Sequence, residues 1–226
     1  MKPLVEGPYF NKILFRDKEG TQMEEKQISI TVLLPAGKLP LDIMDKAREL
    51  ARRFELGVYC SLMQNLRLTN VPESAVATVK EELAALGADF KGPGKFPLPR
   101  VCVGKDHCPL GLVDTKAMSD KIISRFAGRE KTKAKFKIAI SACPLSCSSP
   151  KATDIGLVAT KKGYEVYVGG KGGPFPKVGR RIKREAGPKE ALDIISELVD
   201  FHHQKTLSKQ RMSKLLSDPE FPFAEA

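Results

Sequence analysis

The segment FKIAISACPLSCSSPKATDIGLVAT, residues 136–160, carries the most informative pattern in the chain. Residues 136–140 alternate in the manner of a strand, and residues 155–160 are rich in β-branched side chains, so each predicts a strand. Cys143 and Cys147 lie between these strands, with three residues separating them. The segment therefore predicts a strand that runs directly into a loop holding two cysteines, followed by a second strand.

Another cysteine pair precedes this segment. The sequence CVGKDHC, residues 102–108, places five residues between Cys102 and Cys108, and 34 residues separate Cys108 from Cys143. That interval is long enough for a helix and a returning strand. Prolines lie close to both pairs, and Gly104 lies inside the first, which makes buried packing thiols a weak interpretation.

Four thiolates are the usual complement of a cubane [4Fe–4S] cluster. Zinc ribbons and fingers favour spacings of two to four residues in both halves, and bacterial ferredoxins separate their cysteines by two residues. Neither pattern explains a five-residue spacing combined with a three-residue spacing. We therefore favour a cluster, with a zinc site or buried thiols as the alternatives. The fifth cysteine, Cys60, lies inside a predicted strand and is expected to pack in the core.

The first part of the chain predicts an α+β fold. Helices are expected where apolar side chains recur with a period of 3.6 residues, and strands where they alternate. The expected strands are 28–34, 58–62 and 66–69, and the expected helices are 41–54 and a segment from Pro72 to Gly87. This β-α-β-α order over about 65 residues predicts a ferredoxin-like half-module.

A stretch rich in proline and glycine, KGPGKFPLPR at residues 91–100, predicts a boundary between two domains. We assign residues 1–95 to the ferredoxin-like module with an N-terminal extension. Residues 96–226 form a second, α/β domain. Its further expected elements are a helix at 114–127, a strand at 164–168, a glycine-rich basic loop at 169–179, a long helix from Pro188 and an irregular C-terminal tail.

Composition excludes several classes of protein. Of the 226 residues, 42% are hydrophobic and 29% are charged, which rules out a disordered chain and a disulfide-packed miniprotein. No apolar run approaches the roughly 20 residues that cross a bilayer, so no membrane insertion is expected. The N-terminal residues show no export signal, and the cysteine number is odd, so we expect a reducing, cytoplasmic location.

The net charge of +11 predicts an anionic partner. The excess is uneven: residues 91–140 hold 12 basic and 4 acidic side chains, and residues 161–190 hold 9 and 3. A nucleic acid is the weaker interpretation, because aromatic residues make up only 7%, tryptophan is absent and no RNA or DNA motif is present.

The cysteine pattern resembles the signature of the sirohaem–[4Fe–4S] sulfite and nitrite reductases. CVGKDHCPLG is similar to the first cysteine loop of that family, and SACPLSCSSPKATDIGLVA to the second loop and its following strand. VYCSLMQNLRLTNVPES and GGKGGPFPKVGRRI also resemble family segments, so the likeness spans roughly residues 28–205. It implies a small, single-module enzyme of the assimilatory type with an α+β fold.

The resemblance implies roles for particular residues. Cys102, Cys108, Cys143 and Cys147 would hold the cluster, and the Cys147 sulfur would also be the axial ligand of the sirohaem iron. The carboxylates of sirohaem and an anionic substrate would then account for the positive charge. Expected substrate-facing residues are Arg67, Lys105 and Lys151. Expected cofactor-facing residues are Gln64, Asn65, Lys171, Arg180 and Arg181.

Three positions depart from the family pattern. Met63 stands where an arginine precedes Gln64-Asn65, Leu145 where asparagine is common, and Ser149 where arginine is common. Larger members of the family use two copies of these modules, whereas this chain has one. A homodimer could therefore supply the missing cations.

The expected activity is the six-electron reduction of sulfite to sulfide. Nitrite reduction to ammonia is the alternative within the class, and a non-catalytic electron-transfer subunit is the second alternative. The chain has no G-x-G-x-x-G dinucleotide motif after a strand, so electrons are expected from an external ferredoxin or flavoprotein.

Overall fold

The structure is a computed structural model that describes residues 14–16, 22–133, 135–206 and 210–226. Residues 1–13 and 17–21 of the expected N-terminal extension lie outside the described residues. The chain forms two compact units. Of the described residues, the first unit contains those up to Val32, Pro40–Cys60 and Leu66–Phe90, and the second contains those of Leu33–Leu39, Ser61–Asn65 and Lys91–Ala226. The domain boundary between residues 95 and 96 stays a prediction.

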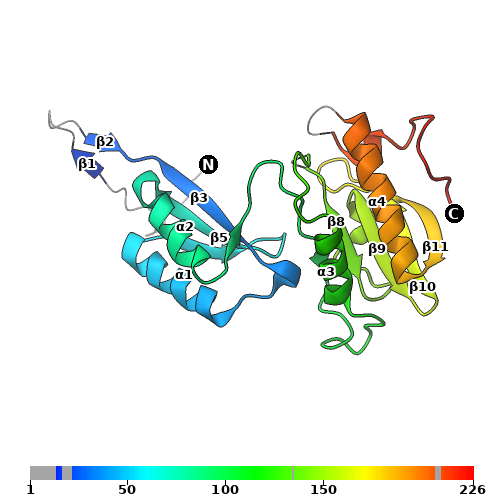
Figure 1. The fold of residues 1–226 in the computed structure, drawn as a ribbon, viewed down its shortest axis with the longest axis horizontal. Coiled ribbons are helices and arrows are strands. Elements are labelled where there is room, and N and C mark those ends of the chain that lie inside the picture. Colours follow the sequence, from blue (N-terminus) through cyan, green and yellow to red (C-terminus); the bar gives the residue numbers. More distant parts are fainter. Residues whose placement is uncertain (1–13, 17–21, 134, 207–209) are drawn as a thin grey trace, which may run out of the picture. The chain divides into compact units, whose positions relative to one another are not determined.

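A four-stranded sheet and two helices form the first unit (Figure 1). Its elements are β3 (Gln27–Leu33), α1 (Leu41–Phe54), β4 (Gly57–Cys60), β5 (Leu66–Pro72), α2 (Val76–Ala84) and β6 (Asp89–Phe90). The strands lie in the order β4-β5-β3-β6, and β5 pairs antiparallel with both β3 and β4. This βαββαβ arrangement confirms the ferredoxin-like prediction. The short strands β1 (Leu14–Arg16) and β2 (Gln22–Glu24) pair with each other as a separate antiparallel sheet.

The core of this unit forms where the two helices meet the sheet. Helices α1 and α2 pack side by side, and Glu82 of α2 accepts hydrogen bonds from Lys46 and Arg53 of α1. Apolar side chains from the sheet and from both helices are fully buried, namely those of Val32, Leu50, Leu68, Val79 and Leu83. Helix α1 has the bounds that the apolar period predicted.

The expectation for Cys60 was wrong, because its side chain is exposed rather than packed in the core. Strand β4 ends at Cys60 and forms an edge of the sheet. Its neighbours Val58 and Tyr59 are exposed too, since an edge strand is covered on fewer sides than a central one. Alternating apolar residues identified the strand but not its place in the sheet.

The second unit is a five-stranded mixed sheet covered by two helices. Its strands are β7 (Arg100–Val101), β8 (Ile138–Ser141), β9 (Ile155–Thr160), β10 (Gly163–Val168) and β11 (Arg180–Ala186), and its helices are α3 (Thr115–Arg125) and α4 (Pro188–Lys205). The order is β11-β10-β9-β8-β7. Strand β8 pairs parallel with both β7 and β9, whereas β10 pairs antiparallel with both β9 and β11.

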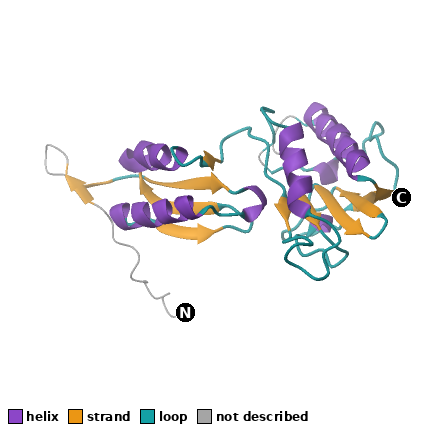
Figure 2. Ribbon diagram, turned by 60° about the horizontal axis from the view of Figure 1, so that its bottom comes forward, coloured by secondary structure: helices purple, strands orange, loops and turns teal. Residues whose placement is uncertain are grey.

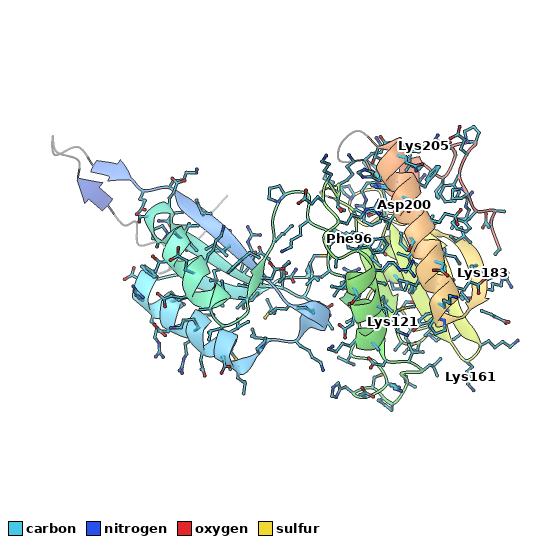
Figure 3. The ribbon with its side chains drawn as sticks, viewed as in Figure 1. Phe96, Lys121, Lys161, Lys183, Asp200 and Lys205 are labelled. Atoms are coloured by element: carbon cyan, nitrogen blue, oxygen red, sulfur yellow. The ribbon has the colours of Figure 1, made fainter. Side chains whose placement is uncertain are left out.

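Helices α3 and α4 cross the sheet beside each other in both ribbon views (Figure 2). An apolar core cluster of this unit lies between these helices and the central strands. Its fully buried members include Ile122, Ile138, Ile140, Ile155, Leu157, Ile195 and Leu198. Figure 3 labels the charged side chains of Asp200 and Lys205 on α4 and of Lys183 on β11.

The sequence analysis missed two strands of this sheet. Strand β7 contains only two residues and follows a segment with three prolines, so it shows no alternation. Strand β11 has the sequence RRIKREA, in which charged residues hide the pattern. Charged side chains are common on edge strands, and β11 lies at one edge of the sheet. No described helix has the length and apolar character needed to cross a membrane.

Candidate cofactor site

The parallel pairing of β7 and β8 brings the two cysteine loops to the same edge of the sheet. Val101 pairs with Ile140 in register, so both strands end at the same level. Cys102 follows β7 directly, and Cys143 comes two residues after β8. Because the carboxyl ends of neighbouring parallel strands lie together, loops that are far apart in sequence meet there.

The four cysteines of the two loops, Cys102, Cys108, Cys143 and Cys147, line a single cavity of about 500 Å³. Cys143 is buried, Cys102 and Cys108 are half-buried, and Cys147 is exposed. The other lining residues come from the two loops, the strand ends and the segment before β5: Leu62, Gln64, Arg100, Val101, Val103, Gly111, Ser141, Ala142, Leu145, Ser148 and Ser149. The structure thus brings together the residues that the sequence predicted as ligands.

Backbone hydrogen bonds fold the first cysteine loop back on itself. Lys105 N donates to Val113 O at 3.0 Å, and Gly111 N donates to Cys108 O at 2.9 Å. The Thr115 hydroxyl at the start of α3 donates to Cys102 O at 2.6 Å. A Cβ atom at Gly111 would lie 2.6 Å from Lys105 Cα, so only glycine allows this close approach.

The second cysteine loop is two successive tight turns. Ser146 N donates to Cys143 O at 3.2 Å, and Ser149 N donates to Ser146 O at 2.7 Å. Ser146 and Ser149 adopt left-handed backbone conformations with φ of 59° and 52°. The Ser148 hydroxyl is buried and donates to Ile140 O at 2.7 Å, which anchors the end of the loop to β8.

The donor set fits an iron–sulfur cluster. None of the four cysteines is in a disulfide. Ala142 N donates to Cys102 Sγ at 3.1 Å, and hydrogen bonds of this kind stabilise the negative charge of a cluster thiolate. Among the described residues, no group of three or more histidine, cysteine or acidic side chains is arranged to hold a single metal ion.

Gln64 and Asn65, expected to contact the cofactor, make structural hydrogen bonds. Gln64 Nε2 donates to Val101 O at 2.7 Å, and Val101 N donates to Gln64 Oε1 at 2.8 Å. The side-chain amide therefore pairs with the free edge of β7 as a neighbouring strand would. Asn65 is buried, and its Oδ1 accepts from Leu34 N at 3.0 Å. Gln64 also lines the cavity, so its cofactor role stays a prediction.

Arg100 is a cavity residue that the sequence analysis missed. It is half-buried, and its Nε donates to Ser148 O at 2.8 Å. Burial lowers the pKa of the guanidinium, which nevertheless stays charged. Its position two residues before Cys102 was the available signal, but the proline-rich linker assignment concealed it.

The basic residues predicted from the resemblance lie outside the set that lines this cavity. Lys105 is exposed on the first loop, and Lys151 lies over the Tyr167 ring at 5.0 Å. Lys171 forms a backbone bridge with Lys177.

Two of the predicted arginines lie on β11. The Arg180 guanidinium lies 4.9 Å from the Phe221 ring centroid, and Arg181 forms an ion pair with Glu165 at 2.7 Å. Arg67 belongs to the first unit, where it lies over the Tyr59 ring at 5.9 Å. All six basic residues stay predictions as substrate- or cofactor-binding groups.

Two of the three departures from the family pattern lie in the cavity wall. Leu145 is 67% exposed at the tip of the second loop, and Ser149 ends that loop. Met63 is half-buried and is not among the lining residues. The cavity wall is therefore apolar at position 145, where the resemblance led us to expect asparagine.

The fold and the cavity together define an α+β protein with a four-cysteine site suited to an iron–sulfur cluster. The family model of the nitrite and sulphite reductase 4Fe-4S domain matches residues 98–219, and the nitrite/sulfite reductase ferredoxin-like half domain matches residues 21–86. The chain belongs to this nitrite and sulphite reductase family, as the sequence resemblance predicted.

Relatives carry both kinds of activity in their names. An assimilatory-type sulfite reductase of Nitratidesulfovibrio vulgaris is 29% identical over 86% of this chain and 89% of its own length. An NAD(P)H nitrite reductase of Emericella nidulans is 26% identical over 83% of this chain but only 17% of its own length. The chain therefore spans most of the first relative and a small part of the second.

Solved structures of the same fold include the NirA protein of Mycobacterium tuberculosis, with a TM-score of 0.69 and 18% identity. That match covers 95% of this chain and 42% of NirA. Dissimilatory sulfite reductase I also has a TM-score of 0.69, at 11% identity over 83% of this chain and 65% of its own. The family carries a [4Fe–4S] cluster and sirohaem, which confirms the predicted cofactors.

Proposed function

We propose that this protein is a sirohaem-dependent sulfite reductase that reduces sulfite to sulfide with six electrons from an external donor. The observation that carries the proposal is the convergence of four free cysteines on one cavity in a chain of this family. The sulfite reductase that matches along nearly its whole length supports sulfite as the substrate. When bound, the cluster and the sirohaem supply single-electron transfer to the oxyanion.

The residues of the cavity would hold the cluster and balance its charge. Cys102, Cys108, Cys143 and Cys147 are the proposed ligands, and the last of these is the proposed link to sirohaem. The Ala142 amide already donates to the Cys102 sulfur. A partly buried site that gathers four thiolates needs such donors, because uncompensated negative charge away from water is costly.

Cations would bind the substrate anion and stabilise the charge that develops as its S–O bonds break. Lys105 lies between the two cysteines of the first pair in sequence, and its side chain is exposed. Arg67 and Lys151 are the other proposed substrate-binding residues. Lys171, Arg180 and Arg181 are proposed to face the carboxylates of the cofactor.

The test is anaerobic purification followed by two measurements. The native protein should contain about five iron and four acid-labile sulfide atoms per chain, because one cubane supplies four of the irons and one sirohaem supplies the fifth. With a chemical electron donor it should then turn over sulfite to sulfide. A preparation that contains both cofactors but reduces nitrite and not sulfite would replace the proposed substrate.

Nitrite is the second candidate because several relatives of this chain are named nitrite reductases. Side-by-side measurement of kcat/KM with the two anions separates the candidates. A specificity for nitrite of tenfold or more corresponds to about 1.4 kcal/mol of better transition-state binding.

A non-catalytic electron-transfer subunit is favoured by one structural observation: the apolar side chain of Leu145 in the wall of the cavity. A protein that holds the cluster but reduces neither anion would support this candidate. The homodimer also stays a prediction, and sedimentation equilibrium of the cofactor-loaded protein tests it.

A further inference from the structure

Arg100 spans the two cysteine loops. Its backbone pairs with Ala139 inside the sheet, two residues before the first cysteine of the cavity. Its side chain reaches the other loop, where Nε donates to Ser148 O at 2.8 Å. Ser148 directly follows Cys147, so a short hydrogen bond connects the strand before the first ligand with the residue after the last one.

The same side chain is the charged group in the cavity wall. Among the described residues that line the cavity, Arg100 alone carries a positively charged side chain. It is half-buried, so water and salt screen it less than they screen an exposed lysine. Its charge also acts on a neighbour: the pKa of Lys137 is lowered by burial and then by the cations of Arg211 and Arg100.

We propose that Arg100 is a positioning residue that holds the Cys147 loop and supplies a fixed positive charge which raises the reduction potential of the cluster. This inference rests on the cluster-binding part of the proposed function. Reduction adds one negative charge to the cluster and its thiolates. A cation held at the cavity wall stabilises that reduced state, and its effect falls with distance and screening.

Two substitutions separate the charge of Arg100 from its role as a connection between the loops. Arg100→Lys keeps the positive charge but loses the planar guanidinium. Arg100→Gln keeps a hydrogen-bond donor but removes the charge. The matched control is Lys121→Gln, which removes one positive charge from an exposed position on α3 of the same unit (Figure 3).

The experiment is a redox titration of the cofactor-loaded proteins, monitored by the electron paramagnetic resonance signal of the reduced cluster, with iron content measured on each sample. We expect Arg100→Gln to shift the midpoint potential to more negative values. Arg100→Lys and Lys121→Gln should keep the parental potential.

Several outcomes would overturn the inference. One is an Arg100→Gln protein with full iron content and the parental potential. Another is an Arg100→Lys protein that retains the cluster at a lowered potential. If Arg100→Gln loses the cluster, retention of the cluster at the parental potential in Arg100→Lys supports the role of charge. Equal loss in both variants would overturn the role of charge and leave only the positioning of the loop by the guanidinium. A parent protein without iron would instead overturn the proposed function itself.

Discussion

Cys147 and Cys60 are both exposed thiols, yet only Cys147 lines the cavity with the other three paired cysteines. We expect Cys147→Ser to lose most of the bound iron and acid-labile sulfide, because a hydroxyl is a poor replacement for a cluster thiolate. Cys60→Ser should retain the parental amounts. Colorimetric iron and sulfide analysis of proteins purified anaerobically measures both. Equal loss in the two variants would contradict the assignment.

Gln64 offers a second test at the residue scale, because its amide makes two hydrogen bonds to Val101. Gln64 has φ of 60°, a left-handed conformation that asparagine tolerates. Gln64→Asn should shorten the side chain and break both bonds, at a cost of about 1–3 kcal/mol. We expect the Val101 amide to exchange hydrogen about tenfold faster or more.

Hydrogen exchange measured by mass spectrometry on the peptide that contains Val101 follows this change. Gln27→Asn is the control, since Gln27 is exposed on β3. It should leave the exchange of Val101 unchanged. Parental exchange in Gln64→Asn would show that the side-chain amide does not hold the edge of β7.

The free energy of unfolding should depend on pH because of the buried side chain of His202. Burial, which includes packing against Phe136, lowers the pKa of its imidazole. The nearby charges of Lys133 and His203 lower this pKa further. The hydrogen bond to Gln210 O and the Asp154 carboxylate raise it, but by less. The folded state thus disfavours the protonated ring. The resulting stability is complete above the unfolded-state pKa of about 6.5 and is lost as the pH falls through the lower, folded-state pKa.

Thermal unfolding at about pH 7.5 and about pH 5.5 measures this loss. The parent and His203→Gln should lose more stability on acidification than His202→Gln, because His203 is exposed on the same helix and His202→Gln no longer titrates. A parental pH dependence in His202→Gln would contradict the assignment.

At the scale of elements, one attachment of the C-terminal segment to the sheet is a buried carboxylate. Asp154, just before β9, is fully buried, and it accepts from Arg211 Nε at 2.8 Å, Met212 N at 3.0 Å and Lys137 N at 3.1 Å. Arg211→Gln leaves this carboxylate without its cation. The expected destabilisation is about 3–5 kcal/mol.

Chemical denaturation of the full chain measures this destabilisation. The control is Lys183→Gln, which breaks the ion pair with Glu190 between side chains that are 41% and 46% exposed. An exposed pair contributes about 0–1 kcal/mol. A similar small effect of Arg211→Gln would show that the buried pair does not hold the segment.

At the scale of the whole molecule, the net charge of +11 favours association with an acidic electron donor. Because the Debye length falls to about 10 Å at 0.1 M salt, turnover driven by an acidic ferredoxin should decrease strongly as salt is added. Turnover driven by a small chemical donor should change less. Steady-state rates at low and moderate ionic strength make the comparison, and equal salt dependence would argue against an acidic protein donor.

Much of this molecule follows from local sequence patterns. The ferredoxin-like module and the helices α1 and α4 were predictable, because apolar periodicity is a property of short segments. The two cysteine pairs were visible as a spacing pattern, and their role as cluster ligands stays a prediction. The charge excess followed from composition alone. The family resemblance then connected these features with the cofactors.

Only the tertiary structure decided what surrounds the four cysteines of the cavity. The short strand β7 has no pattern of its own and exists because it pairs with β8, and this pairing brings Cys102 beside the second cysteine loop. The exposure of Cys60 on an edge strand and the contact of Arg100 with Ser148 likewise depend on distant segments. Such contacts join residues far apart in the chain, so no local pattern records them.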